Sequence, residues 1–285
     1  MTECIFEAPI AGQLAPRLLV SVRSVSEASD AVKGGCQILD VKEPSQGSLG
    51  KADNGVIAEV LRVGLSSGTP VSAALGEVTD YSASQRSKCE DLQLPESLSR
   101  LSFVKIGLAG LRHDSGWLGR WQDTLSFLTA PLSTASETNT PRWVAVIYAD
   151  WQTADAPSPS GIIDCVLSSS ESIGSNIAGV LVDTWSKKSG RLLDSLPIEQ
   201  LKELASSVQQ SGRFFAVAGR LTSNMLPELG SFWPDVVAVR SAACRDQERT
   251  SSVDVGAVRT LREDIDKTFS VGSSKAALPI GAVHD

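Results

Sequence analysis

Lysines and aspartates occur together at the ends of apolar runs, where they could do chemistry. Asp40 and Lys42 end the run ILDVK, Lys105 lies in SFVKIG, and Asp183 ends GVLVD, with Lys187 shortly after it. A buried ammonium costs several kcal/mol unless it is paired, so these lysines need counter-charges or a function. A lysine that is crowded by cations and partly desolvated loses its proton near neutral pH and can then attack a carbonyl carbon. The pattern indicates Schiff-base chemistry, and a structural ion-pair network at this place stays an open alternative.

Short buried strands are the elements that must position these residues. Apolar runs rich in Val, Ile, Leu and Ala recur along the chain, each followed by a polar or glycine-bearing turn and a helical pattern. Near-continuous apolarity is typical of parallel strands buried on both faces, and eight βα units are the number that closes a barrel. The sequence therefore predicts an α/β protein with a single (β/α)8 TIM barrel. The predicted strands are 18–22, 37–42, 70–74, 102–106, 143–148, 179–183, 214–218 and 236–240.

Alternation along each strand predicts which side chains face the barrel interior. Successive side chains of a strand point to opposite faces. Because Leu39 and Val41 suit the helix side, Asp40 and Lys42 are expected to point inward, and the same alternation directs Lys105 inward. Active sites of such barrels lie at the carboxyl ends of the strands. We therefore expect these charges at that mouth.

The helical patterns between the strands have recognisable ends. Ser24 is placed to cap a first helix that Gly34 and Gly35 end, and further helices are expected at 54–68, 117–128 and 197–210.

The expected domain organisation is one barrel between two short flanks. Residues 1–16 form a lead, residues 17–269 form the barrel, and the Gly/Ala/Ser-rich residues 270–285 are expected to be a disordered tail. A Ser/Thr/Pro-rich stretch near 129–142 predicts a flexible insertion on the side of the barrel away from the chemistry.

Three loops after predicted strands have residues suited to an anionic group. EPSQGSLG follows Lys42 directly and offers Ser48 with several backbone N–H groups, although a plain turn explains it as well. The loops after the seventh and eighth strands often bind phosphate in barrel enzymes. The first of these loops contains Gly219 and Arg220, and the second contains Arg240 and Ser241. The two arginines are expected to clamp the phosphate by charge, and Gly219 and Ser241 are expected to donate backbone N–H groups to it. Solvated surface arginines are the competing interpretation.

Composition excludes several classes of function. The chain has 26 basic and 33 acidic residues and a formal net charge of −7, without a basic run, which argues against nucleic-acid binding. Five scattered cysteines and two distant histidines indicate neither a disulfide framework nor a metal site. No apolar run approaches the ~18 residues of a membrane span, and the first segment lacks the features of a signal peptide. We expect a cytoplasmic protein without a membrane partner.

Six stretches of the chain match one known family. They are LLVSV (18–22), GGCQILDVKEPSQGSLG (34–50), PVSAALGE (70–77), VKIGLAG (104–110), VDT followed by Lys187, and VAVRSAAC with DQERTSSVD, which extends the match to Asp254. On these stretches the chain resembles the (5-formylfuran-3-yl)methyl phosphate synthases of methanofuran-type cofactor biosynthesis. The block DVKEPxxGSLG is the most specific of them.

The resemblance implies a barrel of class I aldolase type with a defined reaction. It would condense two molecules of glyceraldehyde 3-phosphate to the phosphorylated hydroxymethyl-furaldehyde, with loss of phosphate and water. Lys42 would be the Schiff-base lysine, Lys105 the proton acceptor and Lys187 a further essential lysine, while Asp40 and Asp183 would hold and tune them. The resemblance implies no metal and no organic cofactor. The expected partners are a small phosphorylated aldehyde as substrate and further copies of the chain in a homo-oligomer.

Two other functions stay open on the sequence alone. One is a different Schiff-base phosphosugar aldolase on the same barrel. The other is a non-catalytic barrel that binds a phosphorylated metabolite.

Overall fold

Eight short apolar segments form the strands that the sequence predicts. The structure is a computed structural model that describes residues 15–87, 92–134, 140–168, 176–186 and 190–270. Within these ranges, eight parallel strands pair in chain order, and the last strand pairs back onto the first to close the ring. The predicted (β/α)8 barrel is therefore confirmed. The strands are β1 (Arg17–Val22), β2 (Ile38–Val41), β3 (Val71–Glu77), β4 (Phe103–Gly107), β5 (Arg142–Tyr148), β6 (Ile177–Asp183), β7 (Phe214–Val217) and β8 (Val236–Val239).

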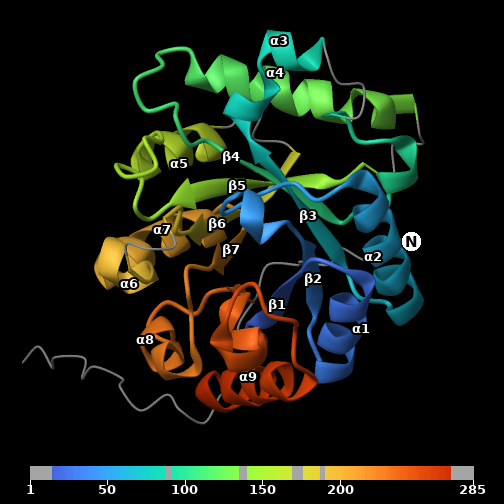
Figure 1. Cartoon of the computed structure of the whole chain (residues 1–285). Helices are drawn as coiled ribbons and strands as arrows, with labels where there is room; N and C mark the ends of the chain where they lie inside the picture. The colour runs from blue at the N-terminus through green and yellow to red at the C-terminus, as the bar shows by residue number, and fades with distance from the viewer. Residues whose placement is uncertain (1–14, 88–91, 135–139, 169–175, 187–189, 271–285) are drawn as a thin grey trace, which may run out of the picture.

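Helices surround the ring of strands (Figure 1). They match the predicted ranges in the first, second, fourth and sixth crossovers. Two other crossovers have only four-residue helices in the described ranges, α3 between β3 and β4 and α8 between β7 and β8. The helices are α1 (Val25–Gly34), α2 (Asn54–Ser67), α3 (Ala83–Arg86), α4 (Trp117–Thr129), α5 (Pro159–Leu167), α6 (Leu192–Ser195), α7 (Ile198–Gln210), α8 (Leu226–Leu229) and α9 (Val255–Thr268).

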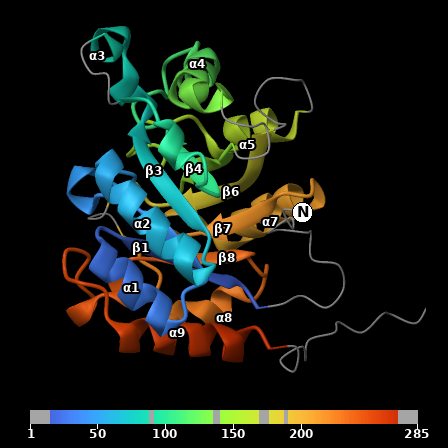
Figure 2. The same cartoon turned by 90° about the vertical axis from the view of Figure 1, so that its right-hand side faces the viewer.

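The first helix shows how local sequence and packing agree. The Ser24 side chain caps α1 by accepting a hydrogen bond from the backbone N of Glu27 at 3.3 Å, and the helix ends at Gly34 as predicted. A Cβ atom at Gly34 would lie 2.5 Å from the Cβ of Val258, so the absence of a side chain lets α1 lie close against α9. Figure 2 shows these two helices side by side. The first and last helices are thus packed together where the ring closes.

Two apolar layers follow from the alternation of side chains. Leu39 and Val41 lie in the core between the strands and the helices, whereas Ile38 lies in a second core inside the ring. Phe103 and Phe214 fill this interior with an edge-to-face contact whose ring centroids are 5.4 Å apart. The predicted inward face of β2 and β4 is confirmed, because Ile38 and Phe103 share parity with the charged residues of their strands.

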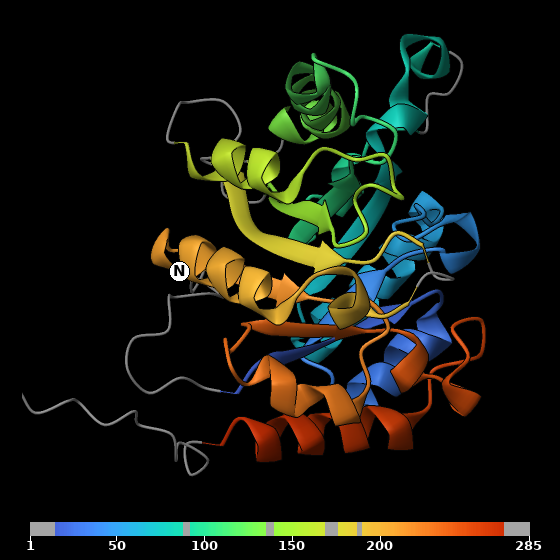
Figure 3. The same cartoon turned by 90° about the vertical axis from the view of Figure 1, so that its left-hand side faces the viewer.

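The sequence predicts a flexible insertion near 129–142, between α4 and β5. After α4 the chain forms a short 3₁₀ helix (Ala130–Thr134), and β5 begins at Arg142. Residues 135–139, where the flexible insertion is predicted, lie outside the described residues, as do 1–14 of the lead and 271–285 of the tail. Figure 3 shows α7, α8 and α9, coloured orange to red, together on one side of the barrel. No helix in the described ranges is long and apolar enough to cross a membrane.

Candidate active site

A cavity of about 240 Å³ opens at the carboxyl ends of the strands. It lies at the end of the barrel where α/β barrel enzymes position their reacting groups. Its walls come from β1, β2, β4, β6 and β8 and from the loops that follow β2, β7 and β8. The structure brings together here eight of the ten residues singled out from the sequence: Asp40, Lys42, Lys105, Asp183, Gly219, Arg220, Arg240 and Ser241.

Lys42 is the first residue after β2, and its side chain reaches the cavity wall. Its backbone N donates to the carbonyl of Val22 at 3.1 Å, which extends the pairing of β2 with β1 by one residue. On the other side, the backbone N of Glu43 donates to the carbonyl of Gly50 at 2.8 Å. The loop from Glu43 to Gly50 is thus closed at its base. Lys42, which precedes this loop, is only 8% exposed. A short, doubly anchored segment directs the amine toward the cavity.

Lys105 and Asp40 form a buried ion pair beneath the cavity. Their side chains are 4% and 2% exposed. The Lys105 amine also donates to Oγ of Ser72 at 3.1 Å, and Oγ of Ser21 donates to Oδ2 of Asp40 at 3.1 Å. Lys105 therefore uses two of its three N–H groups within the described residues, and it lines both the cavity and the apolar interior below it. The pair lies at the boundary between packed hydrocarbon and the open site.

Asp183 ends β6 and is held by the loop that follows β2. The Ser48 Oγ lies 3.1 Å from Oδ2 of Asp183 and 3.0 Å from the carbonyl of Thr184. The backbone N of Thr184 donates to Oδ1 of Asp183 at 2.7 Å. Ser48 is itself buried and lies behind the cavity wall, so its position suits orienting Asp183 more than touching a substrate.

The loop after β6 is anchored by a second aspartate. Oδ1 of Asp150 accepts a hydrogen bond from the backbone N of Trp185 at 2.7 Å, and its Oδ2 accepts one from the backbone N of Ser186 at 2.9 Å. These are the residues immediately before Lys187. Lys187 itself lies outside the described residues, so its predicted role stays a prediction.

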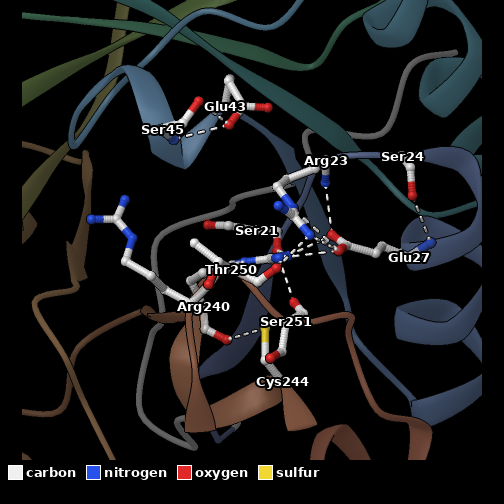
Figure 4. A network of polar contacts seen from close by, with 11 residues as sticks. Ser21, Arg23, Ser24, Glu27, Glu43, Ser45, Arg240, Cys244, Thr250 and Ser251 are labelled. Atoms are coloured by element: carbon white, nitrogen blue, oxygen red, sulfur yellow. Dashed lines mark hydrogen bonds and ion pairs between the residues drawn. The ribbon is translucent and has the colours of Figure 1, made fainter.

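Arg240 lines the cavity, as the sequence suggests for a phosphate clamp, but its guanidinium is engaged by other parts of the protein. Its guanidinium donates to both carboxylate oxygens of Glu27 at 2.5 and 3.1 Å. It also donates to the carbonyls of Ser21, Arg249 and Ser251, each at 2.9 Å (Figure 4). Five N–H groups thus meet five protein contacts, and none is left for a phosphate in this arrangement. Arg240 instead ties β8 to β1, α1 and the loop before α9.

The charge of Glu27 is stabilised by this arrangement. Burial alone raises the pKa of the Glu27 carboxyl, but the hydrogen bonds and charge of Arg240, with those of Arg23, outweigh it, so the pKa lies below its ordinary value. Glu27 is 4% exposed and stays ionised beside its two arginines.

A half-buried acid at the end of β3, Glu77, is absent from the sequence-based site. Tyr148 donates from Oη to Oε1 of Glu77 at 2.5 Å, and the backbone N of Ala109 donates to Oε2 at 3.0 Å. Burial raises the pKa of Glu77 to about 7, against the opposing effect of these two hydrogen bonds. Gly107 makes room for the carboxylate, because a Cβ there would lie 2.0 Å from Oε2 of Glu77.

Alternation along β3 fails at this position for a local reason. The pairing of β3 with β4 shifts register between Ala74 and Glu77, and Gly76 has a φ of +80°. A simple two-residue period would put Glu77 on the same face as Val71 and Ala73, on the helix side. In the sequence, the irregularity is marked by Gly76, which directly precedes Glu77 at the end of the strand.

Arg249 is a second cavity residue that was not singled out. It lies in the loop between β8 and α9 and lines the cavity together with Gln247 and Glu248. Burial lowers the pKa of its guanidinium. For the residues that the structure describes, no group of three or more His, Cys, Asp or Glu side chains is arranged to hold a metal ion.

Comparison with known proteins identifies one family. A family model described as 4-HFC-P synthase matches residues 18–262. A (5-formylfuran-3-yl)methyl phosphate synthase from Methanococcus maripaludis strain C7 is 33% identical over 232 residues, which cover 81% of this chain and 91% of that protein. The synthase of the same name from Archaeoglobus fulgidus is 26% identical over 250 residues, covering 87% of this chain and 99% of the relative.

Solved structures with the same fold are far more distant in sequence. KGPDC from Streptococcus mutans superposes with a TM-score of 0.52 at 11% identity, covering 90% of this chain and all of that one. The 3-hexulose-6-phosphate synthase from Salmonella typhimurium gives a TM-score of 0.53 at 13% identity, with 88% of this chain and 99% of that one covered. These likenesses support the barrel fold alone.

Proposed function

The chain belongs to the 4-HFC-P synthase family, and we propose that it catalyses the synthesis of (5-formylfuran-3-yl)methyl phosphate, the product for which its relatives are named. The substrate would be glyceraldehyde 3-phosphate, two molecules of which are joined with loss of one phosphate and of water. The chemistry would proceed through a Schiff base on Lys42. The observation that carries the proposal is the place of Lys42 on the cavity wall, next to the buried Lys105–Asp40 pair.

Lys42 is the proposed nucleophile. Four basic side chains, Lys105, Arg220, Arg240 and Arg249, line the same cavity with three acidic ones, Asp40, Asp183 and Glu248. Lys42 is 8% exposed, and withdrawal from water favours the neutral form of an amine. The neutral amine adds to the aldehyde carbon of the substrate, and loss of water gives an iminium. The iminium then withdraws electrons from the neighbouring carbon, which makes a proton on that carbon easier to remove.

Lys105 is the proposed proton acceptor in that step. Transfer of its proton to Asp40 would give a neutral amine at the base of the cavity, and this amine could take the proton from carbon. Ser21 and Ser72 hold the two partners in place at 3.1 Å, so neither side chain must reorganise during the transfer.

Asp183 and Lys187 are proposed to assist the later losses of water and phosphate. Asp183 is fixed by Ser48 and lines the cavity, where it can orient a hydroxyl group of the condensed intermediate. Lys187 has its role only from the family resemblance.

A phosphate group is proposed to bind where the loops after β7 and β8 meet the cavity. Gly219, Arg220 and Ser241 line this side. Backbone N–H groups in such loops, together with an arginine, are suited to a phosphate dianion.

The decisive experiment is borohydride trapping with glyceraldehyde 3-phosphate. We expect wild-type protein to gain the mass of one reduced substrate adduct, and Lys42→Ala to gain none and to form no ultraviolet-absorbing furaldehyde. Lys33→Ala is the matched control, because Lys33 lies exposed on α1 in a surface pair with Asp30. This control should trap and turn over like wild type.

Each other outcome rejects part of the proposal. An adduct that persists in Lys42→Ala rejects Lys42 as the nucleophile. An adduct on Lys42 with a product other than the furaldehyde phosphate indicates a different phosphosugar aldolase. Unchanged mass in wild-type protein under saturating substrate rejects Schiff-base catalysis and supports a barrel that only binds.

A further inference from the structure

Two arginines fix the loop between β8 and α9 through three consecutive carbonyl groups. Arg240 donates from Nε to the carbonyl of Arg249 at 2.9 Å and from Nη2 to that of Ser251 at 2.9 Å. Arg23 donates from Nη2 to the carbonyl of Thr250, which lies between them, at 2.7 Å. The backbone from 249 to 251 is therefore held on every residue (Figure 4).

A single buried carboxylate holds both arginines. Oε1 of Glu27 contacts Nη2 of Arg23 at 3.2 Å and Nη2 of Arg240 at 3.1 Å, while Oε2 contacts Nη1 of Arg240 at 2.5 Å. Glu27 lies in the first turn of α1, so the loop is anchored to an element formed more than 200 residues earlier in the chain. Charge-assisted contacts of this kind are stronger and more directional than neutral ones. We call Glu27, Arg23 and Arg240 the loop anchor.

The loop anchor leaves the side chain of Arg249 at the cavity with most of its donors unused. Within the described residues its one hydrogen bond runs from Nη2 to the carbonyl of Gly47, at 3.3 Å, and it forms no ion pair there. It is half-buried. The carboxylates of Asp183 and Glu43 act on its charge from a distance, but neither forms an ion pair with it. A guanidinium whose donors are mostly unused at a cavity has the geometry for bidentate binding of a phosphate.

The Arg249 side chain reaches from the loop after β8 toward the loop that follows β2. Its hydrogen bond to Gly47 reaches the loop that follows β2, the same strand that Lys42 follows. A reaction that joins two phosphorylated aldehydes must accommodate two phosphate groups at once. The cavity then needs a second anion-binding group besides the one proposed after β7 and β8.

We propose that Arg249 binds the phosphate group of one of the two substrate molecules, on the β2 side of the cavity, and that Glu27, Arg23 and Arg240 are positioning residues that hold the loop for this purpose. The inference rests on the proposed function for the identity of the substrate. The anion site itself does not depend on turnover.

Titration with inorganic phosphate, followed by calorimetry, tests the site without any reaction. We expect wild-type protein to bind two phosphate ions per chain and Arg249→Ala to bind one, with Arg249→Lys retaining the second ion at about 10-fold weaker affinity. Arg245→Ala is the matched control, because Arg245 is exposed in the same loop and does not line the cavity. Equal stoichiometry and affinity in wild type and Arg249→Ala overturn the proposal.

Steady-state kinetics with glyceraldehyde 3-phosphate give the second measurement. Loss of charged hydrogen bonds to a bound group predicts that Arg249→Ala raises KM about 10- to 100-fold with little change in kcat. Normal phosphate binding in a protein that does not convert glyceraldehyde 3-phosphate would reject the proposed function alone. A reduced kcat at unchanged KM and unchanged phosphate affinity would reject the role of Arg249 alone.

A double-mutant cycle tests the loop anchor as a positioning device. Arg23→Ala removes the contact to the Thr250 carbonyl and is expected to raise KM severalfold. In the Arg249→Ala background the same change should have no further effect on KM, because the side chain that it positions is gone. Additive effects of Arg23→Ala and Arg249→Ala on KM would show a general structural role and overturn the assignment.

Discussion

The barrel has two buried ion pairs, which differ in whether all N–H donors of the basic side chain are used within the protein. Lys105–Asp40 joins β4 to β2, and Arg240–Glu27 joins the end of β8 to α1; all four side chains are at most 6% exposed. Every N–H of Arg240 has a protein acceptor. Among the residues that the structure describes, Lys105 has two acceptors for its three N–H groups, and it borders the cavity. A saturated pair can only hold structure, while an unsaturated pair at a cavity can take part in proton transfer.

The largest difference between the two ion pairs is expected when the amine of Lys105 is removed. Lys105→Met keeps the length of the side chain and removes the amine, so we expect turnover of glyceraldehyde 3-phosphate to fall by about 10³- to 10⁴-fold. Trapping of the substrate on Lys42 with borohydride should persist, since Lys42 follows β2 whereas Lys105 lies on β4. Turnover within tenfold of wild type would contradict the proposed proton transfer.

Removal of Arg240 should affect stability instead. Arg240→Met leaves the Glu27 carboxylate buried without its main partner, and the expected loss in the free energy of unfolding is about 3–5 kcal/mol, measured by urea denaturation. The double variant Glu27→Met with Arg240→Met should regain most of this loss, because no unpaired charge remains. An equal loss in both variants would show that packing, not the ion pair, stabilises this region.

The fold was predictable where apolar and polar residues alternate regularly. The site was predictable where the alternation along a single strand decides which way a side chain points. Asp40, Lys42 and Lys105 follow from parity on β2 and β4, which have no irregularity at these positions. The partner of Arg240 could not be predicted, because Glu27 lies 213 positions away and no local pattern links the two. Glu77 was missed because the register shift beside it reverses the face on which it lies.

Glu77, a half-buried acid, offers a third titratable side chain to set beside the two ion pairs. Its pKa of about 7 lies above the ordinary value of 4.5, so the folded chain keeps a proton that the unfolded chain releases between these pH values. Its contribution to stability is therefore fully present below about pH 4.5 and is lost as the pH rises through about 7. Glu77→Gln should remove this loss.

The measurement is the free energy of unfolding at pH 5 and pH 8 for both proteins. The difference between wild type and Glu77→Gln should change by about 2 kcal/mol between the two pH values, with wild type relatively weaker at pH 8. A difference that does not depend on pH would show that Glu77 is ionised throughout.

The smallest expected effect concerns Ser48. Ser48→Ala removes one hydrogen bond to Asp183 while the backbone N of Thr184 continues to hold the other carboxylate oxygen. We expect a loss of about 1 kcal/mol in stability and a severalfold lower kcat. An unchanged kcat would mean that Thr184 alone is enough to orient Asp183.

The pairing of β8 with β1 has a consequence for how the chain is made. During synthesis β1 emerges first, yet its partner strand and Arg240 follow only after more than 200 further residues. Until then the nascent sheet has two unpaired edges, which are sites where strands of other molecules can add. Ring closure is thus a late, long-range event, and the newly translated protein depends on its outcome to escape aggregation.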